Sequence, residues 1–372
     1  MSRRILSLAC AGLCAMLPEL ARAGVTNPDI SVVGQPFFAV TDDPNNLDRN
    51  RLVPDLGEVE LVFEAYLNPY ARGYLRPTIG EEGLEVEEGY FHLLRGLPLG
   101  FSLRGGQYRV GFGRLNQMHP HMLPFAERFG VMAAYLPGEE AVIEIGASVS
   151  NRIPIHGDFS VDLAADWLRG DSFRIQREPS TDPADPLNTG GDDHAGEHRP
   201  AYNGRLTGFA MLGEQSALEF GLSGLGGTNN VAAGTTTQVY GADLKAKLWT
   251  SPRAYLVLQA EGLVLEREDA AWDSASAGYT STRVRPVGGS MYANYNFALR
   301  YNVGASYEQY QEPEPDKPWS QSVGAFAGYS LLEETTVFAA DWRRFIPETG
   351  DAVDTFTLRV IFSMGPHKAH QF

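Results

Sequence analysis

The strongest constraint on this sequence is an alternation of apolar and polar residues with a period of two, which recurs from one end of the chain to the other. In Asp354 to Met364 the apolar side chains occupy every second position, and Tyr240 to Leu248 and Leu299 to Tyr307 follow the same rule. A period of two places successive side chains on opposite faces of a β-strand, whereas a helix would scatter them around its circumference. The pattern therefore predicts an all-β protein.

The overall composition favours a barrel in a membrane over a soluble β-protein. After residue 23 there is no run of about 18 apolar residues that could span a bilayer as a helix. The chain nevertheless combines 40 glycines, 16 tyrosines and 19 phenylalanines with only 43% hydrophobic residues, which is unusual for a soluble core of this length. In a transmembrane barrel only alternate residues face lipid, so mean hydropathy stays low. A soluble sandwich or propeller is the alternative, but it would have shorter strands, and no blade repeat of about 40 residues is visible.

The connections between the alternating stretches are themselves alternately short and long. This asymmetry is typical of outer-membrane barrels, which have short periplasmic turns and longer extracellular loops. We therefore expect a transmembrane antiparallel β-barrel of about 16 strands. The predicted long polar connections are 42–56, 112–139, 168–200, 225–235, 266–282, 311–319 and 346–352.

The N-terminal segment, residues 1–23, has the pattern of a signal peptide. Two arginines precede the apolar run Ile5 to Leu17, and Ala21 to Ala23 gives the small-x-small sequence of a cleavage site. Both cysteines of the chain, Cys10 and Cys14, lie inside this segment. The mature chain is therefore expected to contain no disulfide, no thiolate metal site and no cysteine nucleophile.

The mature chain, residues 24–372, is acidic. The full sequence has 30 basic and 46 acidic residues, and removal of three arginines and one glutamate with the signal peptide leaves 27 and 45. Such a chain repels a phosphate backbone, which argues against nucleic acid as a partner.

We expect the mature chain in the outer membrane of a Gram-negative bacterium, in contact with the lipid bilayer and lipopolysaccharide. The terminal aromatic residue Phe372 is similar to the signal that the barrel-assembly machinery recognises, which makes that machinery an expected partner.

Seven stretches spread over the mature chain carry a resemblance to known sequences: 27–31, GEVELVFEAYLNPYARG (57–73), GQYRVGFGRLNQMHPHMLPF (106–125), 217–229, VYGADLKAKL (239–248), 258–263 and MGPHKAHQF (364–372). These stretches resemble an uncharacterised family of bacterial outer-membrane barrels related to the phosphate-selective porins. The resemblance implies a sixteen-stranded barrel, a homotrimer, and passage of small polar or anionic solutes. The chain departs from the phosphate-selective type because it lacks a visible series of closely spaced lysines.

The long connection 112–139 is the candidate for a loop that folds inward and constricts the barrel. It carries aromatic and apolar residues that a purely solvated loop would not have, so part of it is expected to be buried. A few charges in a narrow opening of low dielectric dominate ion selectivity. The alternative is that Arg114 and Asn116 only attach the loop to the wall. The predicted constriction residues are Arg114, His119, His121, Glu127 and Arg128.

The alternation also predicts which charged residues face the interior of the barrel. Acids on the same face, such as Glu60, Glu219 and Asp341, are expected to form cross-strand pairs with the cations. A basic track for anions would require the cations to gather on one side of the wall. The predicted interior cations are Arg72, Arg76, Arg104, Arg205, Lys245, Lys247, Arg300, Arg343 and Arg359.

Two acidic regions stand apart from this interior set. Glu87 and Glu88, close to three further glutamates, are interpreted as an acidic patch that is solvated or screened by calcium, rather than as a general acid and base pair. The acidic extracellular loop 168–200 contains histidines beside carboxylates, a combination that suits zinc. Its richness in Pro, Gly and Asp also fits a mobile solvated loop. The candidate metal ligands are Asp192, Asp193, His194 and His198.

The function that these patterns favour is passive diffusion of small polar or ionic solutes through a porin-like channel, with no cofactor. Two alternatives remain open at this level: a zinc-binding or zinc-uptake protein, and a non-conducting surface or adhesin barrel. An enzyme is not expected, because the sequence has no Gly-x-Ser-x-Gly elbow and no identifiable serine and histidine pair.

Overall fold

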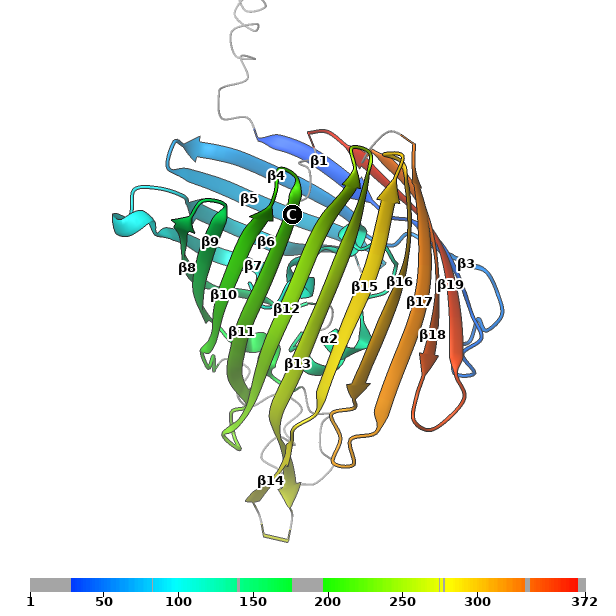
Figure 1. The fold of residues 1–372 in the computed structure, drawn as a ribbon. Coiled ribbons are helices and arrows are strands. Elements are labelled where there is room, and N and C mark those ends of the chain that lie inside the picture. The colour runs from blue at the N-terminus through cyan, green and yellow to red at the C-terminus, as the bar shows by residue number, and fades with distance from the viewer. Residues whose placement is uncertain are drawn as a thin grey trace, which may run out of the picture.

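The computed structural model describes residues 28–81, 83–138, 141–175, 197–273, 275–276, 278–331 and 335–366. In this part of the chain, nineteen strand segments form one continuous sheet that closes on itself (Figure 1). The segments are β1 (Asp29–Gly34), β2 (Phe37–Thr41), β3 (Val53–Asp55), β4 (Val59–Asn68), β5 (Ala71–Gly80), β6 (Gly83–Leu93), β7 (Ser102–Arg109), β8 (Ile143–His156), β9 (Phe159–Leu168), β10 (Ala201–Leu212), β11 (Ser216–Asn230), β12 (Thr235–Ser251), β13 (Ala254–Asp273), β14 (Gly278–Val284), β15 (Val287–Phe297), β16 (Tyr301–Gln311), β17 (Trp319–Ser330), β18 (Thr336–Ile346) and β19 (Val353–Met364).

Three of the strands are interrupted, so nineteen segments correspond to sixteen strands. β1 and β2 are separated by Gln35 and Pro36, β14 and β15 by Arg285 and Pro286, and β3 and β4 by residues 56–58. Proline has no N–H group to donate to a neighbouring strand, which interrupts the hydrogen-bond ladder at the first two sites. Counted in this way, the sheet is a closed antiparallel barrel of sixteen strands, as the sequence predicts.

The first and last strands pair with each other and close the barrel. β1 pairs with β19 at Val32 and Met364, and β2 pairs with β19 at Val40 and Phe356. A closed sheet has no edge with unpaired backbone groups, which is the condition for strands to lie in lipid.

The two faces of the wall are reversed relative to those of a soluble protein. In β19, Phe356 and Leu358 are 40% and 43% exposed on the outside, whereas Thr357 and Arg359 are 2% and 3% exposed on the inside. Adjacent positions in the other strands alternate in the same sense, with Leu, Phe and Trp outside and charged residues inside. An apolar outer face with a polar interior suits a barrel that is surrounded by hydrocarbon.

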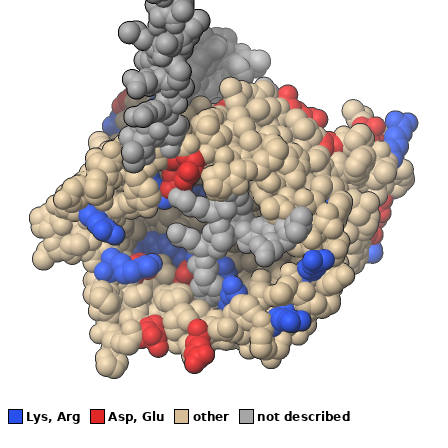
Figure 2. All heavy atoms as spheres, turned by 90° about the horizontal axis from the view of Figure 1, so that it is seen from above, with Lys and Arg blue, Asp and Glu red and all other residues tan. Residues whose placement is uncertain are grey.

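The two ends of the barrel differ. At the end we call the turn end, strands are joined by tight connections, and in the β4–β5 turn the amides of Tyr70 and Ala71 donate to Asn68 Oδ1 at 2.9 and 3.0 Å. The barrel is hollowed at this end, and Lys and Arg atoms are visible in the hollow (Figure 2). The opposite, loop end has the longer connections (Figure 1). No helix in the described ranges is long and apolar enough to cross a bilayer.

Two of the predicted loops are wrong. β11 and β12 remain paired as far as Asn230 and Thr235, and β13 and β14 as far as Asp273 and Gly278, so 225–235 and 266–282 are mostly strand. Polar residues such as Gln238 occupy outward positions in these extensions. The apolar alternation therefore stops there although the backbone pairing continues, and a prediction based on apolar periodicity ends each strand too early.

Candidate functional site

The connection between β7 and β8, residues 110–142, folds into the barrel, and we name it the inward segment. It contains three short helices: η2 (Leu115–Gln117), η3 (Pro120–Met122) and α2 (Gly130–Tyr135). Asn116 joins the two ends of the segment, because its Nδ2 donates to Val110 O at 2.8 Å and its Oδ1 accepts from Val142 N at 2.9 Å. This amide therefore holds the base of the segment closed, and both of its bonds lie within the segment, whereas the attachment alternative expects Asn116 to contact the wall.

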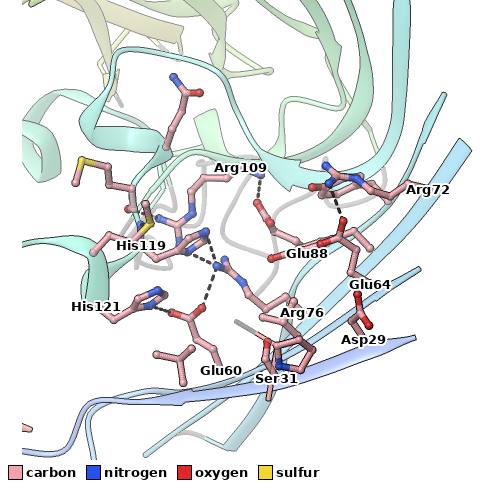
Figure 3. A pocket seen from close by; sticks show the side chains of 18 of the residues that line it. Asp29, Ser31, Glu60, Glu64, Arg72, Arg76, Glu88, Arg109, His119 and His121 are labelled. Atoms are coloured by element: carbon pink, nitrogen blue, oxygen red, sulfur yellow. Dashed lines mark hydrogen bonds and ion pairs between the residues drawn. The ribbon is translucent and has the colours of Figure 1, made fainter. Parts of the chain in front are cut away.

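One side of the inward segment, which we name the charged side, faces β4, β5 and β6 (Figure 3). Arg76 is fully buried there and donates to Glu60 Oε2 at 3.1 Å and to Glu87 Oε2 at 2.5 Å. His121 Nδ1 lies 2.9 Å from Glu60 Oε1, and the His119 ring is stacked on that of His121 at 5.8 Å. The two predicted constriction histidines therefore contact the wall through one buried network of charges.

This network disfavours the protonated form of His119. Burial, together with the guanidinium groups of Arg109 and Arg76, lowers the pKa of His119 well below its ordinary value of 6.5. A neutral imidazole has one nitrogen that can accept a hydrogen bond, and the Arg76 guanidinium lies against the His119 ring. The charged side therefore depends on an uncharged His119.

The interpretation of Glu87 and Glu88 as a solvated patch is wrong. A register shift between Arg76 and Pro77 in the β5–β6 pairing places both glutamates next to interior partners. Glu87 Oε2 accepts from Arg109 Nη2 at 3.0 Å, and Glu88 Oε1 accepts from the Arg109 amide at 2.9 Å. Arg109, which the sequence did not single out, is the last residue of β7. It lies five residues from Arg104, so alternation would assign it to the outer face, and only its contacts at the strand end reveal it.

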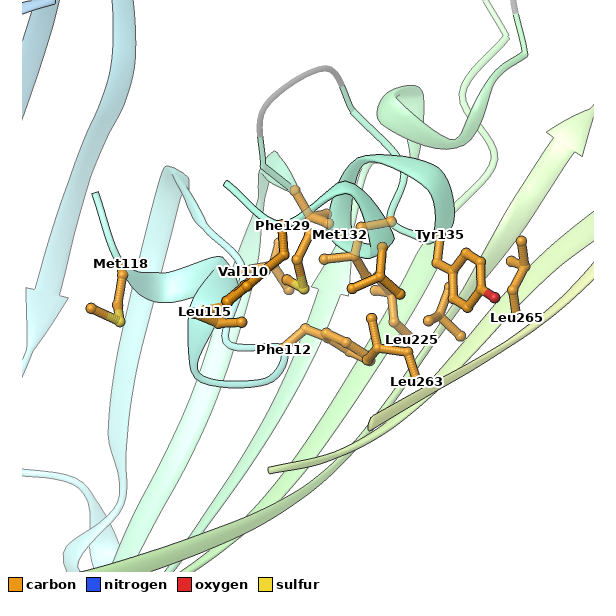
Figure 4. Close-up of a cluster of buried hydrophobic side chains, with 14 of the residues drawn as sticks. Val110, Phe112, Leu115, Met118, Phe129, Met132, Tyr135, Leu225, Leu263 and Leu265 are labelled. Carbon is orange, nitrogen blue, oxygen red and sulfur yellow. The ribbon is translucent and has the colours of Figure 1, made fainter. Parts of the chain in front are cut away.

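The opposite side of the inward segment, which we name the apolar side, packs against the wall from β11 to β17 (Figure 4). The Phe125 ring lies 5.6 Å from the rings of both Tyr292 and Phe326, and the Tyr135 ring lies 6.3 Å from that of Tyr310. Wall residues Leu225, Val239, Leu263 and Leu265 complete the buried cluster. The barrel therefore has its hydrophobic core inside the lumen, built around one connection.

Three wall carboxylates accept hydrogen bonds from the backbone of the inward segment. Glu261 Oε2 accepts from the amides of Arg114 and Leu115 at 3.2 and 3.1 Å. Asp341 accepts from Ala126 N and Glu308 from Val131 N, both at 3.0 Å. The sequence predicts only cross-strand pairs for these acids. Their role as amide acceptors could not be read from it, because that role depends on where a loop 100 or more residues away returns to the wall.

Arg359 and Arg343 also attach the segment to β18 and β19. Arg359 donates to Leu123 O at 3.0 Å, to Pro120 O at 3.3 Å and to Gln35 Oε1 at 3.4 Å. Arg343 forms ion pairs with Glu308, at 2.9 Å, and with Glu127. Both predicted interior cations thus face the lumen, and both are in contact with the inward segment or with its wall acceptors.

The remaining constriction candidates, Arg114 and Arg128, lie on the inward segment itself. Arg114 Nη1 donates to Glu219 on β11 at 3.1 Å, and Arg128 Nη2 donates to Met118 O at 2.6 Å within the segment. The first contact attaches the segment to the wall, whereas the second joins two parts of the segment. A role of the predicted constriction residues in selectivity stays a prediction.

The other predicted interior cations are partly paired across the wall. Arg72 donates to Glu64 on the adjacent strand at 2.7 Å. Arg205 reaches Asp243, two strands away, at 2.6 Å, and a Cβ at the intervening Gly221 would lie 2.5 Å from both partners. Glycine at this position therefore makes the longer pair possible.

Two more of these cations lie beside aromatic rings, and a third, Lys245, is a neighbour of one of them on the same strand. Arg104 lies over the rings of Tyr90 and Tyr108. Lys247 Nζ lies 4.7 Å from the Tyr255 ring, and Lys245 lies two residues along the same face of β12. These three interior cations all lie in the half of the barrel nearer the turn end.

Two predicted sites need separate comment. Arg300 is not part of the interior wall: it lies exposed in the turn between β15 and β16, because β16 begins only at Tyr301. Of the candidate metal ligands, Asp192, Asp193 and His194 lie outside the described residues. His198 is described, and its Nδ1 lies 2.8 Å from Asp171 Oδ1. Among described residues no group of three or more potential ligands is found, and the metal site stays a prediction.

Two cavities flank the inward segment along the barrel axis, one toward the turn end and one toward the loop end. The inner cavity, toward the turn end, has a volume of about 360 Å³, and the outer cavity, toward the loop end, about 800 Å³. The charged residues that line the inner cavity are Arg72, Arg76, Arg104, Arg109, Arg114, Asp29, Glu60, Glu64 and Glu88. Those of the outer cavity are Arg51, Arg343, Asp43, Asp48, Asp55, Asp351 and Glu127.

Comparisons with known proteins support the fold. No family model matches the chain. An uncharacterised protein of Aquifex aeolicus is 29% identical over 351 residues, which cover 86% of this chain and 70% of that protein. An anion-selective porin from Comamonas acidovorans covers 91% of this chain and 100% of its own, with a TM-score of 0.58 and 10% identity.

Two further structures agree. The outer membrane channel DcaP of Acinetobacter baumannii has a TM-score of 0.55 and 11% identity, covering 91% of this chain and 97% of its own. OmpT of Vibrio cholerae, in its trimer form, has a TM-score of 0.56 and 10% identity, covering 91% and 100%. At these identities the likeness shows a porin-like barrel fold.

Proposed function

We propose that the chain is a porin-type channel of the outer membrane, through which small polar or ionic solutes diffuse passively. The observation that carries this proposal is the reversed wall, apolar outside and charged inside, together with a cavity on each side of the inward segment. Charged side chains are stable inside a barrel only where they are paired or meet water. A polar, water-accessible interior is what a hydrophilic solute needs to cross a bilayer.

The solute path is proposed to follow the charged side of the inward segment, because the apolar side is closely packed against the wall. Along their strands, Gln35 and Arg359 each lie between residues that line the inner cavity and residues that line the outer cavity. Arg359 donates a hydrogen bond to Leu123 O at 3.0 Å. We therefore place the constriction at this contact, next to His121 and Glu60.

The proposal includes location and assembly. It places the turn end toward the periplasm and the loop end outside, in the outer membrane of a Gram-negative bacterium, and it involves no enzymatic step. A homotrimer is proposed because the chain resembles porins. One of the similar structures, OmpT of Vibrio cholerae, is a trimer form.

Incorporation of the purified mature protein into planar bilayers tests the channel. A folded barrel, verified by a gel mobility that changes on boiling, is expected to give discrete conductance steps. The variant Arg300→Gln, which alters only an exposed turn, should give steps of the same size. Folded protein that inserts without any step would reject the channel in favour of a non-conducting surface barrel.

A further inference from the structure

The geometry of the inner cavity points to a binding site for a small planar carboxylate, centred on Arg104. This inference rests on the proposed channel function and specifies one class of solute for it. The site would lie on the inner faces of β5, β6 and β7, toward the turn end of the cavity.

Arg104 differs from the other arginines of the inner cavity in whether a carboxylate neutralises its charge. Four of the five have a carboxylate partner: Arg72 with Glu64 at 2.7 Å, Arg76 with Glu60 at 3.1 Å, Arg109 with Glu87 at 3.0 Å and Arg114 with Glu219 at 3.1 Å. Arg104 has no carboxylate partner among the residues that the structure describes. It lines the cavity, and none of its nitrogens is among the buried polar atoms that lack a partner. Its donors are therefore open to the water or solute in the cavity.

The Arg104 guanidinium lies against one aromatic ring and near a second. Its Cζ lies 3.9 Å from the ring centroid of Tyr108 and 5.4 Å from that of Tyr90, and the Tyr90 ring is stacked on Tyr74 at 5.0 Å. Stacking on a ring covers the face of a guanidinium and leaves the N–H groups at its edge available. Those edge donors match the two oxygens of a carboxylate, so a carboxylate can be bound in a bidentate manner.

The strand register explains why the guanidinium can lie in this position. Tyr74, Tyr90 and Gly106 occupy directly opposed positions on β5, β6 and β7. Gly106 lies between Arg104 and Tyr108 on the same face of β7, and its φ of +133° is rarely adopted by other residues. A Cβ there would come within 2.3 Å of Gly89 O and 2.9 Å of Tyr90 Cβ. Because no side chain projects from this position, nothing on this face of β7 separates the Arg104 guanidinium from the Tyr108 ring.

The same arrangement favours a planar carboxylate over inorganic phosphate. A phosphate dianion is best bound by several converging cations, but here four arginines are already neutralised and one is free. The tyrosines beside Arg104 offer apolar ring surface to the body of a solute, and ring contacts of this kind add favourable energy for an aromatic group. An aromatic carboxylate uses both the free guanidinium and the rings.

Binding of benzoate to the folded mature protein in detergent tests the site, by calorimetry or saturation-transfer NMR. Saturable binding is expected in the wild type, weaker for cyclohexanecarboxylate and weakest for inorganic phosphate. Arg104→Gln should weaken benzoate binding by about tenfold, because it removes a charge-assisted bidentate contact. Arg104→Lys, which keeps the charge and loses the fork, should give an intermediate loss.

The control is Arg300→Gln, which removes one positive charge from an exposed turn at the same end of the barrel and should leave binding unchanged. Absence of saturable benzoate binding, equal binding by folded Arg104→Gln, or tighter binding of phosphate than of benzoate would each overturn the site. Conductance is measured separately in bilayers. Steps without benzoate binding reject the site and keep the channel, whereas binding without steps keeps the site and rejects the channel.

Discussion

The two sides of the inward segment are attached to the barrel by different kinds of interaction. On the apolar side, rings such as Phe125 pack among wall side chains, and three carboxylates accept backbone amides. On the charged side, Arg76 and His121 share the carboxylate Glu60. Apolar contacts scale with buried area and respond little to pH or salt, whereas a buried ion network fails when one member is lost. We therefore expect the charged side to be more sensitive than the apolar side to pH and to the loss of a single side chain.

The largest effect is expected from loss of the central cation of the charged side. Arg76→Leu leaves Glu60 and Glu87 buried without their shared partner, which should cost about 3 to 5 kcal/mol and release this side of the segment. Urea unfolding in detergent should show the loss, and single-channel conductance should rise. In the control, Arg152→Gln breaks an exposed pair with Asp162 and should cost less than about 1 kcal/mol. Equal unfolding curves for the two variants would contradict the proposed difference between buried and exposed pairs.

A somewhat smaller effect is expected on the apolar side. Phe125→Ala removes ring contacts with Tyr292 and Phe326 and should weaken attachment of the segment by about 3 kcal/mol. The barrel itself should stay closed, so the measurable change is faster protease cleavage within the segment of the folded protein. Leu47→Ala, at a side chain that is 97% exposed, is the matched control and should not change cleavage. Protease resistance equal to that of the wild type would show that the apolar side does not fix the segment.

The charged side should also respond to pH. Burial and the neighbouring Arg109 and Arg76 hold the pKa of His119 below 6.5, so the attached state disfavours protonation of this ring. Attachment is therefore complete above pH 6.5 and weakens as the pH falls below that value, because the released state binds the proton more tightly.

Conductance should accordingly increase on acidification, and His119→Gln should flatten the response. His156→Gln, at an exposed position by the turn end, is the control and should keep the response of the wild type. His121, Glu60, Arg76 and Arg109 face His119, and an unchanged acid response in His119→Gln would rule out His119 as the group that responds to pH.

The sequence predicted the wall better than the interior. Alternation in stretches such as Asp354 to Met364 reports a local property, the face on which each side chain lies, and it was enough for the fold and for sixteen strands. It was wrong where the end of the apolar alternation is not the end of the strand. Arg300 lies before the start of β16, and β11 to β14 continue beyond their alternating stretches. The apolar residues of 112–139 were likewise readable as a buried set, because burial of Phe125 or Met132 requires only that they leave water.

The partners of the interior charges could not be predicted. Arg205 reaches Asp243 across Gly221, and Glu261 accepts amides from residues almost 150 positions away. Such pairs depend on strand register and on the return point of a loop, and neither has a signature in a single sequence. The position of Glu87 depends likewise on one irregularity in strand pairing.

The smallest expected effect distinguishes the two cavities by charge. The outer cavity is lined by two arginines and five carboxylates, and the inner one by five arginines and four carboxylates. Glu127→Gln should shift the reversal potential slightly toward anions, and Arg104→Gln should shift it further toward cations, because the inner charge has no carboxylate partner among described residues. Both shifts should fade at 1 M salt, where charges are screened over about 3 Å. Glu214→Gln, exposed in a turn, is the control. A larger shift from Glu127 than from Arg104 would mean that the outer mouth, and not the inner cavity, determines which ions pass.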